Sequence, residues 1–342
     1  MRKNLLAFAI AVAIVCAPLY LSGAAQISSL AGVLIEKGYT PVKLKRASNH
    51  FYVSCKLNGR SASLLVDTGA GATLIEPAML KSLGVPLTKV EGDWYGFLGP
   101  AAKSMNAGEI KDFQVGPYQA GAHRVGAWDF SSYRRAKGAP RMDGILGIDF
   151  LHRNQAVIDC FQMDLFLKPP SVSSASATLS AGLRAGGCTE IPIQVTHRGS
   201  TVPAQINGRS GYLVVDTGMR NTMLSEHAIA GLDLHVAALA GSGKRTGIGG
   251  TIRYGVQDIG KNVSSIQRAY VDKMEIGNFG LPSQWVVVGE LPYSKSSGTD
   301  NIFFGYLGQD LLAYYVGIID CAAMQLFLRF DPVIDAARRR RG

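Results

Sequence analysis

Two aspartates stand out because each opens the same short motif. Asp67 begins Asp-Thr-Gly after an apolar run at residues 64–66, and Asp216 begins a second Asp-Thr-Gly after an apolar run at residues 213–215. A given tripeptide is expected by chance about once in several thousand positions, so two copies in matching contexts indicate a shared role. Two carboxylates at hydrogen-bonding distance cannot both ionise cheaply and hold one proton between them. Such a pair can polarise a water, deliver it to an amide carbonyl and protonate the leaving nitrogen.

The residues after each aspartate are suited to hold it in a tight loop. Gly69 and Gly218 allow the backbone to turn without a Cβ clash. Thr68 and Thr217 have hydroxyls that can brace the two loops. We therefore predict that these four residues support a catalytic pair of aspartates.

The two motifs belong to an internal repeat, which must position them. They lie 149 positions apart (216 − 67 = 149), and an Asn-Gly turn precedes each at the same offset, Asn58-Gly59 and Asn207-Gly208. Two later motifs also recur, at an offset of 161 (308 − 147 = 161). They are Ile145-Leu146-Gly147-Ile148-Asp149 with Tyr306-Leu307-Gly308-Gln309-Asp310, and Val157-Ile158-Asp159-Cys160 with Ile318-Ile319-Asp320-Cys321. The larger offset predicts an insertion in a surface hairpin of the second copy.

The pattern within each copy predicts strands. The apolar segments are short, rich in Val, Ile, Leu, Tyr and Phe, and separated by Gly, Asn and Pro. Helical signals are few and follow the Asp-Thr-Gly motifs, at residues 77–83 and 225–230. We predict a mostly β fold with two related lobes, residues 26–168 and 188–332, that face each other about a pseudo-twofold axis. A Ser/Ala/Gly-rich linker at residues 169–187 joins them, and residues 333–342 form a basic tail.

These motifs make the sequence similar to the aspartic protease superfamily, the pepsin-like and retroviral-type enzymes. The resemblance extends over residues 39–330 and includes Ile145-Leu146-Gly147 and Tyr306-Leu307-Gly308, which match the second conserved element of each lobe. Asp-Thr-Gly-Ala at residues 67–70 is similar to the retroviral type, while two copies in one chain resemble pepsin. The resemblance implies two β-barrel lobes with an active-site cleft between them. It also implies an aspartic endopeptidase that needs no cofactor or metal and acts on a peptide or protein substrate.

The family closes its cleft with a glycine-rich hairpin, the flap, and two segments compete for this role. One contains Tyr95 and Gly96, where Tyr95 is the counterpart of a flap tyrosine that orders water. The other is Gly247-Ile248-Gly249-Gly250, which is similar to a retroviral flap tip.

Met219 and Arg220 depart from the family pattern, in which a small residue follows Asp-Thr-Gly. An Arg220 that points inward would hold Asp216 ionised, whereas an outward Arg220 is solvated, which is the arrangement we expect. The departure supports an alternative function, a catalytically inactive pair of lobes that binds a peptide, protein or glycan. A third hypothesis is an enzyme that processes a single partner.

The N-terminus predicts export. Arg2 and Lys3 precede an apolar run at residues 5–21 and small residues at 22–25, so residues 1–25 are expected to be a cleaved signal peptide or a retained membrane anchor. The protein is then periplasmic or secreted, and membrane contact is expected only through this segment. Residues 26–47 form either a short propeptide or an edge strand of the first lobe.

Other residue types exclude several functions. The formal net charge is +10, but no aromatic-interleaved basic stripe accompanies it, so nucleic acid is not an expected partner. The six histidines show no metal-binding spacing, and no Gly-x-Ser-x-Gly motif is present. The aspartates of the later motifs are predicted to be structural. Beyond the leader, three disulfide pairings are open to the four remaining cysteines, Cys55, Cys160, Cys188 and Cys321. We expect the protein to be a monomer.

Overall fold

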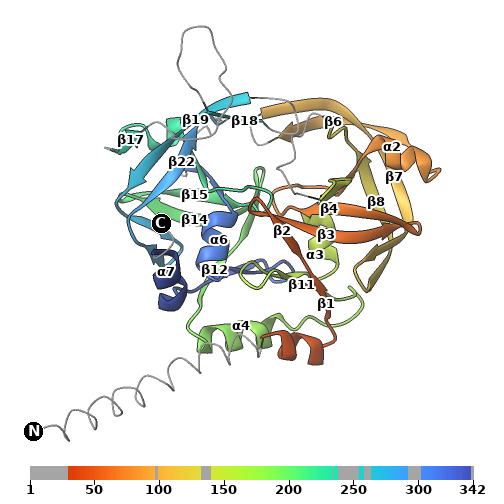
Figure 1. Ribbon diagram of the computed structural model, residues 1–342, viewed down its shortest axis with the longest axis horizontal. Helices are drawn as coiled ribbons and strands as arrows, with labels where there is room; N and C mark the ends of the chain where they lie inside the picture. Colours follow the sequence, from red (N-terminus) through yellow and green to blue (C-terminus); the bar gives the residue numbers. More distant parts are fainter. Residues whose placement is uncertain are drawn as a thin grey trace, which may run out of the picture.

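The computed structural model (Figure 1) describes residues 30–96, 99–131, 140–232, 234–237, 254–257, 263–291 and 302–339. Strands predominate and form three sheets, one in each lobe and one that both lobes share. The first lobe lies on the right of Figure 1 and the second on the left. The predicted mostly β fold with two lobes is confirmed. The predicted leader, residues 1–25, and the flap candidate at residues 247–250 lie outside the described residues.

The first lobe contains an eight-stranded sheet in the order β2-β3-β4-β9-β5-β8-β7-β6. The β3–β4 hairpin turns at Asn58 and Gly59, whose φ angles of 46° and 81° match the twist of the flanking strands. β4 ends at Val66, so Asp67 lies at the end of a buried strand. The strands are β2 (Lys45–Ala47), β3 (His50–Leu57), β4 (Arg60–Val66), β5 (Leu74–Ile75), β6 (Thr88–Gly96), β7 (Gly99–Val115), β8 (Tyr118–Ala127) and β9 (Gly144–Leu146).

The second lobe repeats this design in an 11-stranded sheet, whose main order is β17-β19-β22-β16-β23-β15-β14-β20-β21. β14 has the same order of buried and exposed residues as β3, and its hairpin with β15 turns at Asn207 and Gly208 (φ 47° and 84°). β15 ends at Val215, directly before Asp216. The strands are β13 (Gln194–Thr196), β14 (Gly199–Ile206), β15 (Arg209–Val215), β16 (Met223–Ser225), β17 (His235–Ala237), β18 (Tyr254–Gln257), β19 (Val263–Val271), β20 (Met274–Ile276), β21 (Phe279–Leu281), β22 (Gln284–Gly289) and β23 (Ile302–Leu307).

Strand pairing locates the insertion in the second copy. Ile276 of β20 pairs with Ala204 as Val115 of β7 pairs with Cys55. The offset is therefore already 161 at β20 (276 − 115 = 161) but still 149 at β14 (204 − 55 = 149). The extra residues fall between β14 and β20, in a stretch that includes β17 to β19 and three gaps in the described residues, at 233, 238–253 and 258–262.

The third sheet joins the lobes and has the order β1-β11-β10-β24-β25-β12. Its centre is the antiparallel pair β10–β24, in which Ile158 lies opposite Ile319. β1 is an edge strand here and β2 is an edge strand of the first lobe, which agrees with the edge-strand alternative for this part of residues 26–47. The strands are β1 (Thr40–Lys43), β10 (Val157–Asp159), β11 (Asp164–Leu167), β12 (Thr189–Pro192), β24 (Ile318–Asp320) and β25 (Gln325–Leu328).

Helices cover the shared sheet where a plain linker was expected. Residues 169–187 contain α4 (Ser176–Ala185), whose Leu179 packs with Leu34 of the helical residues 30–36 against Phe166 and Phe327. Both helices lie below the sheet in Figure 1. Alanine-rich sequence has high helix propensity, and burial of Leu179 supplies the packing that a short helix needs. Composition alone did not reveal that contact.

The helices after the Asp-Thr-Gly motifs are present as predicted, and others were missed. α2 (Pro77–Ser82) and α5 (Glu226–Ile229) are the expected ones. α3 (Ile148–Arg153), α6 (Gln309–Tyr314) and α7 (Pro332–Arg339) were not predicted. Six residues make fewer than two helical turns, too few for a clear period in α3 and α6. Among the described helices, none has the length and apolar character to cross a bilayer.

The four cysteines of the described chain are free thiols, so none of the three open pairings is formed. The backbone N–H of Cys160 donates to the Gly317 carbonyl and that of Cys321 to the Ala156 carbonyl, which places the Cα atoms of the two cysteines four positions apart along the paired strands β10 and β24. That separation is about 13 Å, beyond the roughly 7 Å that a disulfide can span. Burial raises the pKa of the thiols of Cys55, Cys160 and Cys321, so they are poor nucleophiles.

We predict that these three thiols resist alkylation in the folded protein. After iodoacetamide treatment and peptide mapping by mass spectrometry, the half-buried Cys188 should be the one of these four cysteines that is labelled to a substantial extent. The same treatment in denaturant should label all four. A disulfide-linked peptide joining any two of them would contradict the structure.

Candidate active site

The two Asp-Thr-Gly loops meet at the boundary between the lobes, where their threonines tie them together. Oγ1 of Thr68 donates to the Val215 carbonyl (2.8 Å) and accepts from the N–H of Thr217 (3.0 Å). Oγ1 of Thr217 donates to the Val66 carbonyl (2.9 Å) and accepts from the N–H of Thr68 (3.0 Å). Both threonines are buried. We call these two residues with their four hydrogen bonds the threonine bridge; it links one lobe to the other.

Backbone donors of its own loop fix each aspartate. Oδ1 of Asp67 accepts from the N–H groups of Gly69 (2.9 Å) and Ala70 (3.0 Å). Because these donors occupy Oδ1, Oδ2 is left to face the other lobe. In the second lobe, Oδ1 of Asp216 likewise accepts from the N–H groups of Gly218 (2.8 Å) and Met219 (3.0 Å).

The two loop glycines let the carboxylates face each other. A Cβ atom on Gly69 would lie 2.5 Å from Cγ of Asp216, and one on Gly218 would lie 2.7 Å from Oδ1 of Asp67. Neither distance is compatible with a real side chain. Neither glycine has φ in the left-handed region, so the lack of space for a Cβ, rather than the predicted tight turn, accounts for glycine here. Each carboxylate therefore packs on the glycine of the opposite loop, and a hydrogen bond joins Asp67 to Asp216.

Burial makes this carboxylate pair retain a proton. Burial raises the pKa of Asp67, and the hydrogen bonds from Asp216 and the backbone offset only part of that rise. The pKa of Asp216 is raised well above its ordinary value by burial and then by the negative charge of Asp67. Asp216 is only 6% exposed, while Asp67 is partly exposed. The two groups titrate as one pair that holds a proton at a pH where a free carboxylate has lost it.

A second layer of hydrogen bonds supports each loop from behind, and sequence reasoning assigned its threonines no role. Oγ1 of Thr73 donates to Asp149 (2.8 Å) and accepts from the N–H of Gly147 (3.2 Å). The repeat-related Thr222 makes the same two bonds: its Oγ1 donates to Asp310 (2.8 Å) and accepts from the N–H of Gly308 (3.0 Å). The signal in the sequence was the 149-residue spacing of the two threonines (222 − 73 = 149). The later aspartates thus have the structural role that was predicted for them.

The residues that depart from the family pattern leave the pair intact. The N–H of Met219 donates to Asp216 as that of Ala70 does to Asp67, and its side chain packs with Val214, Met223 and neighbouring apolar residues. Arg220 is exposed, so it takes the outward position that we expected. It does not contribute to the raised pKa of Asp216.

The first flap candidate lies at the tip of the β6–β7 hairpin. Tyr95 pairs with Pro100 across this hairpin, and its side chain is 64% exposed. Gly96 follows it and pairs with Gly99. No hydrogen bond in the described part of the chain links Tyr95 to either aspartate, so its role as a flap remains a prediction.

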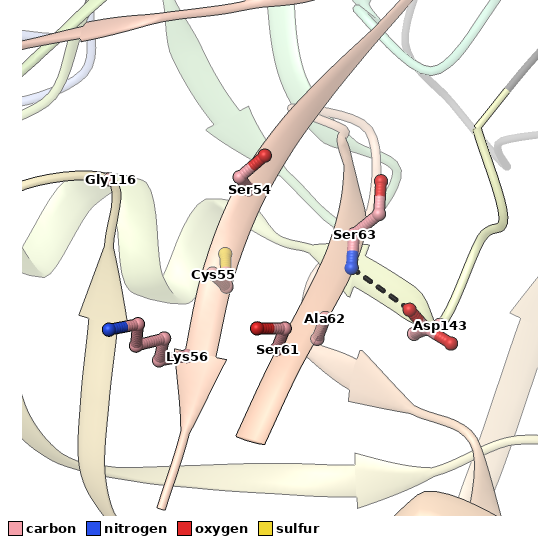
Figure 2. A pocket seen from close by; sticks show the side chains of 8 residues that line it. All are labelled: Ser54, Cys55, Lys56, Ser61, Ala62, Ser63, Gly116 and Asp143. Atoms are coloured by element: carbon pink, nitrogen blue, oxygen red, sulfur yellow. Dashed lines mark hydrogen bonds between the residues drawn. The ribbon is translucent and has the colours of Figure 1, made fainter. Parts of the chain in front are cut away.

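One pocket of the first lobe has neither aspartate in its lining (Figure 2). It has a volume of about 410 Å³ and opens on β3 and β4 of the first lobe, with Ser54, Lys56, Ser61, Ser63 and Asp143 in its lining. Oδ2 of Asp143 accepts from the N–H of Ser63 (2.9 Å), so this carboxylate fastens β4. We place the chemistry at the paired carboxylates instead, because they are the groups with a shared proton. Within the described chain, no cluster of His, Cys, Asp and Glu could hold a metal ion.

We predict that the threonine bridge is a stability element. Thr68→Val and Thr217→Val each leave a buried N–H and a buried carbonyl without a partner, which should cost about 1–3 kcal/mol in the free energy of unfolding. Denaturant unfolding measures this. Thr88→Val is the matched control, because Thr88 is exposed and its hydroxyl contact is 3.4 Å long. Equal stability of all three variants would show that the bridge contributes nothing.

We also predict that Asp216→Asn stabilises the protein near neutral pH. A carboxylate with a raised pKa favours folding below its unfolded pKa and loses that contribution as pH rises through the folded pKa. Asparagine keeps the backbone hydrogen bonds without the charge, and each pKa unit is worth about 1.4 kcal/mol. At a pH of about 7, the melting temperature of the variant should exceed that of the wild type by at least a few degrees. The gain should shrink toward a pH of about 3. A deficit that does not change with pH would refute the raised pKa.

Comparisons with known proteins agree with this architecture. Residues 53–150 match the family model described as aspartyl protease. Among solved structures, the chain is similar to an aspartic proteinase from Irpex lacteus, at 16% identity and a TM-score of 0.50, over 87% of this chain and 99% of that one. Basic 7S globulin from soybean also matches, at 10% identity and a TM-score of 0.40, over 85% of this chain and 94% of that one. The search of curated proteins gave no match. The match over residues 53–150 and the similarity in fold support the predicted resemblance to the aspartic protease superfamily.

Proposed function

We propose that this protein is an aspartic endopeptidase in which Asp67 and Asp216 activate a water. The observation that carries the proposal is the approach of two carboxylates across the lobe boundary, one buried and one partly buried, each on the glycine of the opposite loop. The pair keeps one proton because burial raises the pKa of both groups. Peptide hydrolysis by direct attack of an activated water uses one base and one acid at a single point.

The hydrogen bonds of the loops suit the two carboxylates to their roles. The ionised member of the pair takes a proton from water as the water oxygen attacks the peptide carbonyl carbon. The protonated member donates to the carbonyl oxygen, and a proton then passes to the leaving nitrogen as the C–N bond breaks. Backbone donors to Oδ1 stabilise negative charge on each aspartate, and the threonine bridge keeps the distance between the loops constant through these transfers.

The alternative function, an inactive pair of lobes that binds a ligand, rested on Met219 and Arg220. Met219 donates to Asp216 in the usual way and Arg220 is exposed, so neither residue favours the alternative. A broad peptidase and an enzyme for a single partner have the same catalytic groups. They differ in the peptides that they accept.

We also propose that the protein acts outside the cytoplasm, as a periplasmic or secreted monomer. The support is the signal-like layout of residues 1–25. Free thiols are compatible with an oxidising compartment here, because three are buried and have raised pKa values.

We predict that Asp67→Asn and Asp216→Asn each abolish cleavage of a diverse peptide library, measured by mass spectrometry from acid to neutral pH. Either substitution removes the shared proton system, so the rate should fall by at least about a thousandfold. The control variant Asp112→Asn replaces an exposed carboxylate on β7 and should cleave peptides like the wild type. Circular dichroism confirms that the variants fold. Cleavage that survives in either Asn variant would rule out the dyad.

A further inference from the structure

The backbone of Arg220 lies close to the candidate catalytic pair. It lies two residues after Gly218, so their Cα atoms are at most about 7 Å apart, and Gly218 packs directly on Asp67. The Arg220 side chain is exposed. Its charge is not among the causes that shift the pKa of either aspartate, so it faces the surroundings of the pair rather than the carboxylates themselves.

Arg220 also lies at the boundary between the lobes. His50, the first residue of β3 in the first lobe, is hydrogen-bonded to the backbone of Gly218. Burial and then the nearby charge of Arg220 lower the pKa of His50 to about 4. His50 is therefore neutral at higher pH, and Arg220 alone supplies the positive charge at this point.

The repeat shows that this charge is present on one side of the pair only. The 149-residue offset aligns Arg220 with Gly71 and His50 with Gly199 (220 − 71 = 149, 199 − 50 = 149). The alignment is structural, because β3 and β14 have the same sequence of buried and exposed residues. Arg220 and His50 lie near the second loop, and glycines occupy both repeat-related positions.

No carboxylate neutralises Arg220 in the part of the chain that the structure describes. An exposed guanidinium presents several N–H donors in a planar fork that matches a carboxylate. A peptide bound across the exposed side of the catalytic pair would bring its side chains within reach of this fork.

We propose that Arg220 selects peptides with an acidic side chain on one side of the cleaved bond. The inference rests on the proposed function and specifies its substrate class. Arg220 binds the substrate carboxylate, and Gly71 imposes no such preference on the other side. The expected contribution is that of a charge-assisted pair at a partly exposed site, a preference of about threefold to tenfold.

The test compares peptides that differ only in Glu or Gln at each position around the cleaved bond, at a pH of about 5.5, where glutamate is ionised. The wild type should give a higher kcat/KM for the Glu peptide at one position on one side. Arg220→Gln should abolish the preference, Arg220→Lys should keep part of it, and Arg220→Glu should reverse it. Arg124→Gln, at an exposed arginine of β8, is the matched control and should keep it in full.

Equal cleavage of Glu and Gln peptides by the wild type would overturn the inference and leave the proposed function standing. So would a preference that survives in Arg220→Gln.

Binding to the Asp67→Asn variant, measured by fluorescence anisotropy, separates the two proposals if the wild type cleaves nothing. Tighter binding of the Glu peptide that disappears with Arg220→Gln would support the role of Arg220, although the proposed function has failed. Equal binding of both peptides would overturn that role as well.

Discussion

The burial of two carboxylates against each other is the constraint on which the rest of this structure depends. A carboxylate removed from water is costly unless hydrogen bonds and a shared proton compensate for it. Each lobe meets this requirement with two backbone donors to Oδ1, and the opposite glycine makes room for Oδ2. The loop conformation, the glycines and the strand that delivers each loop all follow from the need to bring Asp67 and Asp216 together.

The lobes are joined in two places that differ in kind. The threonine bridge is polar and buried, and it fixes the loops at the site. The β10–β24 pair joins strands of both lobes by backbone hydrogen bonds into the shared sheet. The helix at residues 30–36 and α4 cover this sheet. Together they hold the carboxylates at one separation, which general acid–base chemistry needs because proton transfer depends strongly on distance.

The two halves are related but not identical, and their differences lie in the residues around the pair. His123 lies 3.2 Å from Asp149 and packs on Phe150; burial alone would raise the pKa of Asp149, but hydrogen bonds from His123 and Thr73 lower it. Asp310 keeps a raised pKa because burial outweighs its own hydrogen bonds. A symmetric site would bind a peptide equally in both directions, whereas a peptide chain has a direction. The difference between Arg220 and Gly71 is the one from which we propose that the site distinguishes the two sides of the cleaved bond.

The sequence by itself determined that the chain is an internal duplication, that its fold is mostly β, and that Asp67 and Asp216 are the candidate catalytic pair. These features are local or periodic: an apolar strand before Asp-Thr-Gly, Asn-Gly turns, and fixed offsets between motifs. Tertiary structure decided the rest. The reason for Gly69 and Gly218 is contact with the opposite carboxylate. The partners of Thr73 and Thr222 lie at the starts of helices α3 and α6, more than seventy residues away. The helix at residues 176–185 depends on burial of Leu179 against a sheet built from both lobes. Such contacts depend on how distant segments pack, and a single sequence contains no local pattern that records them.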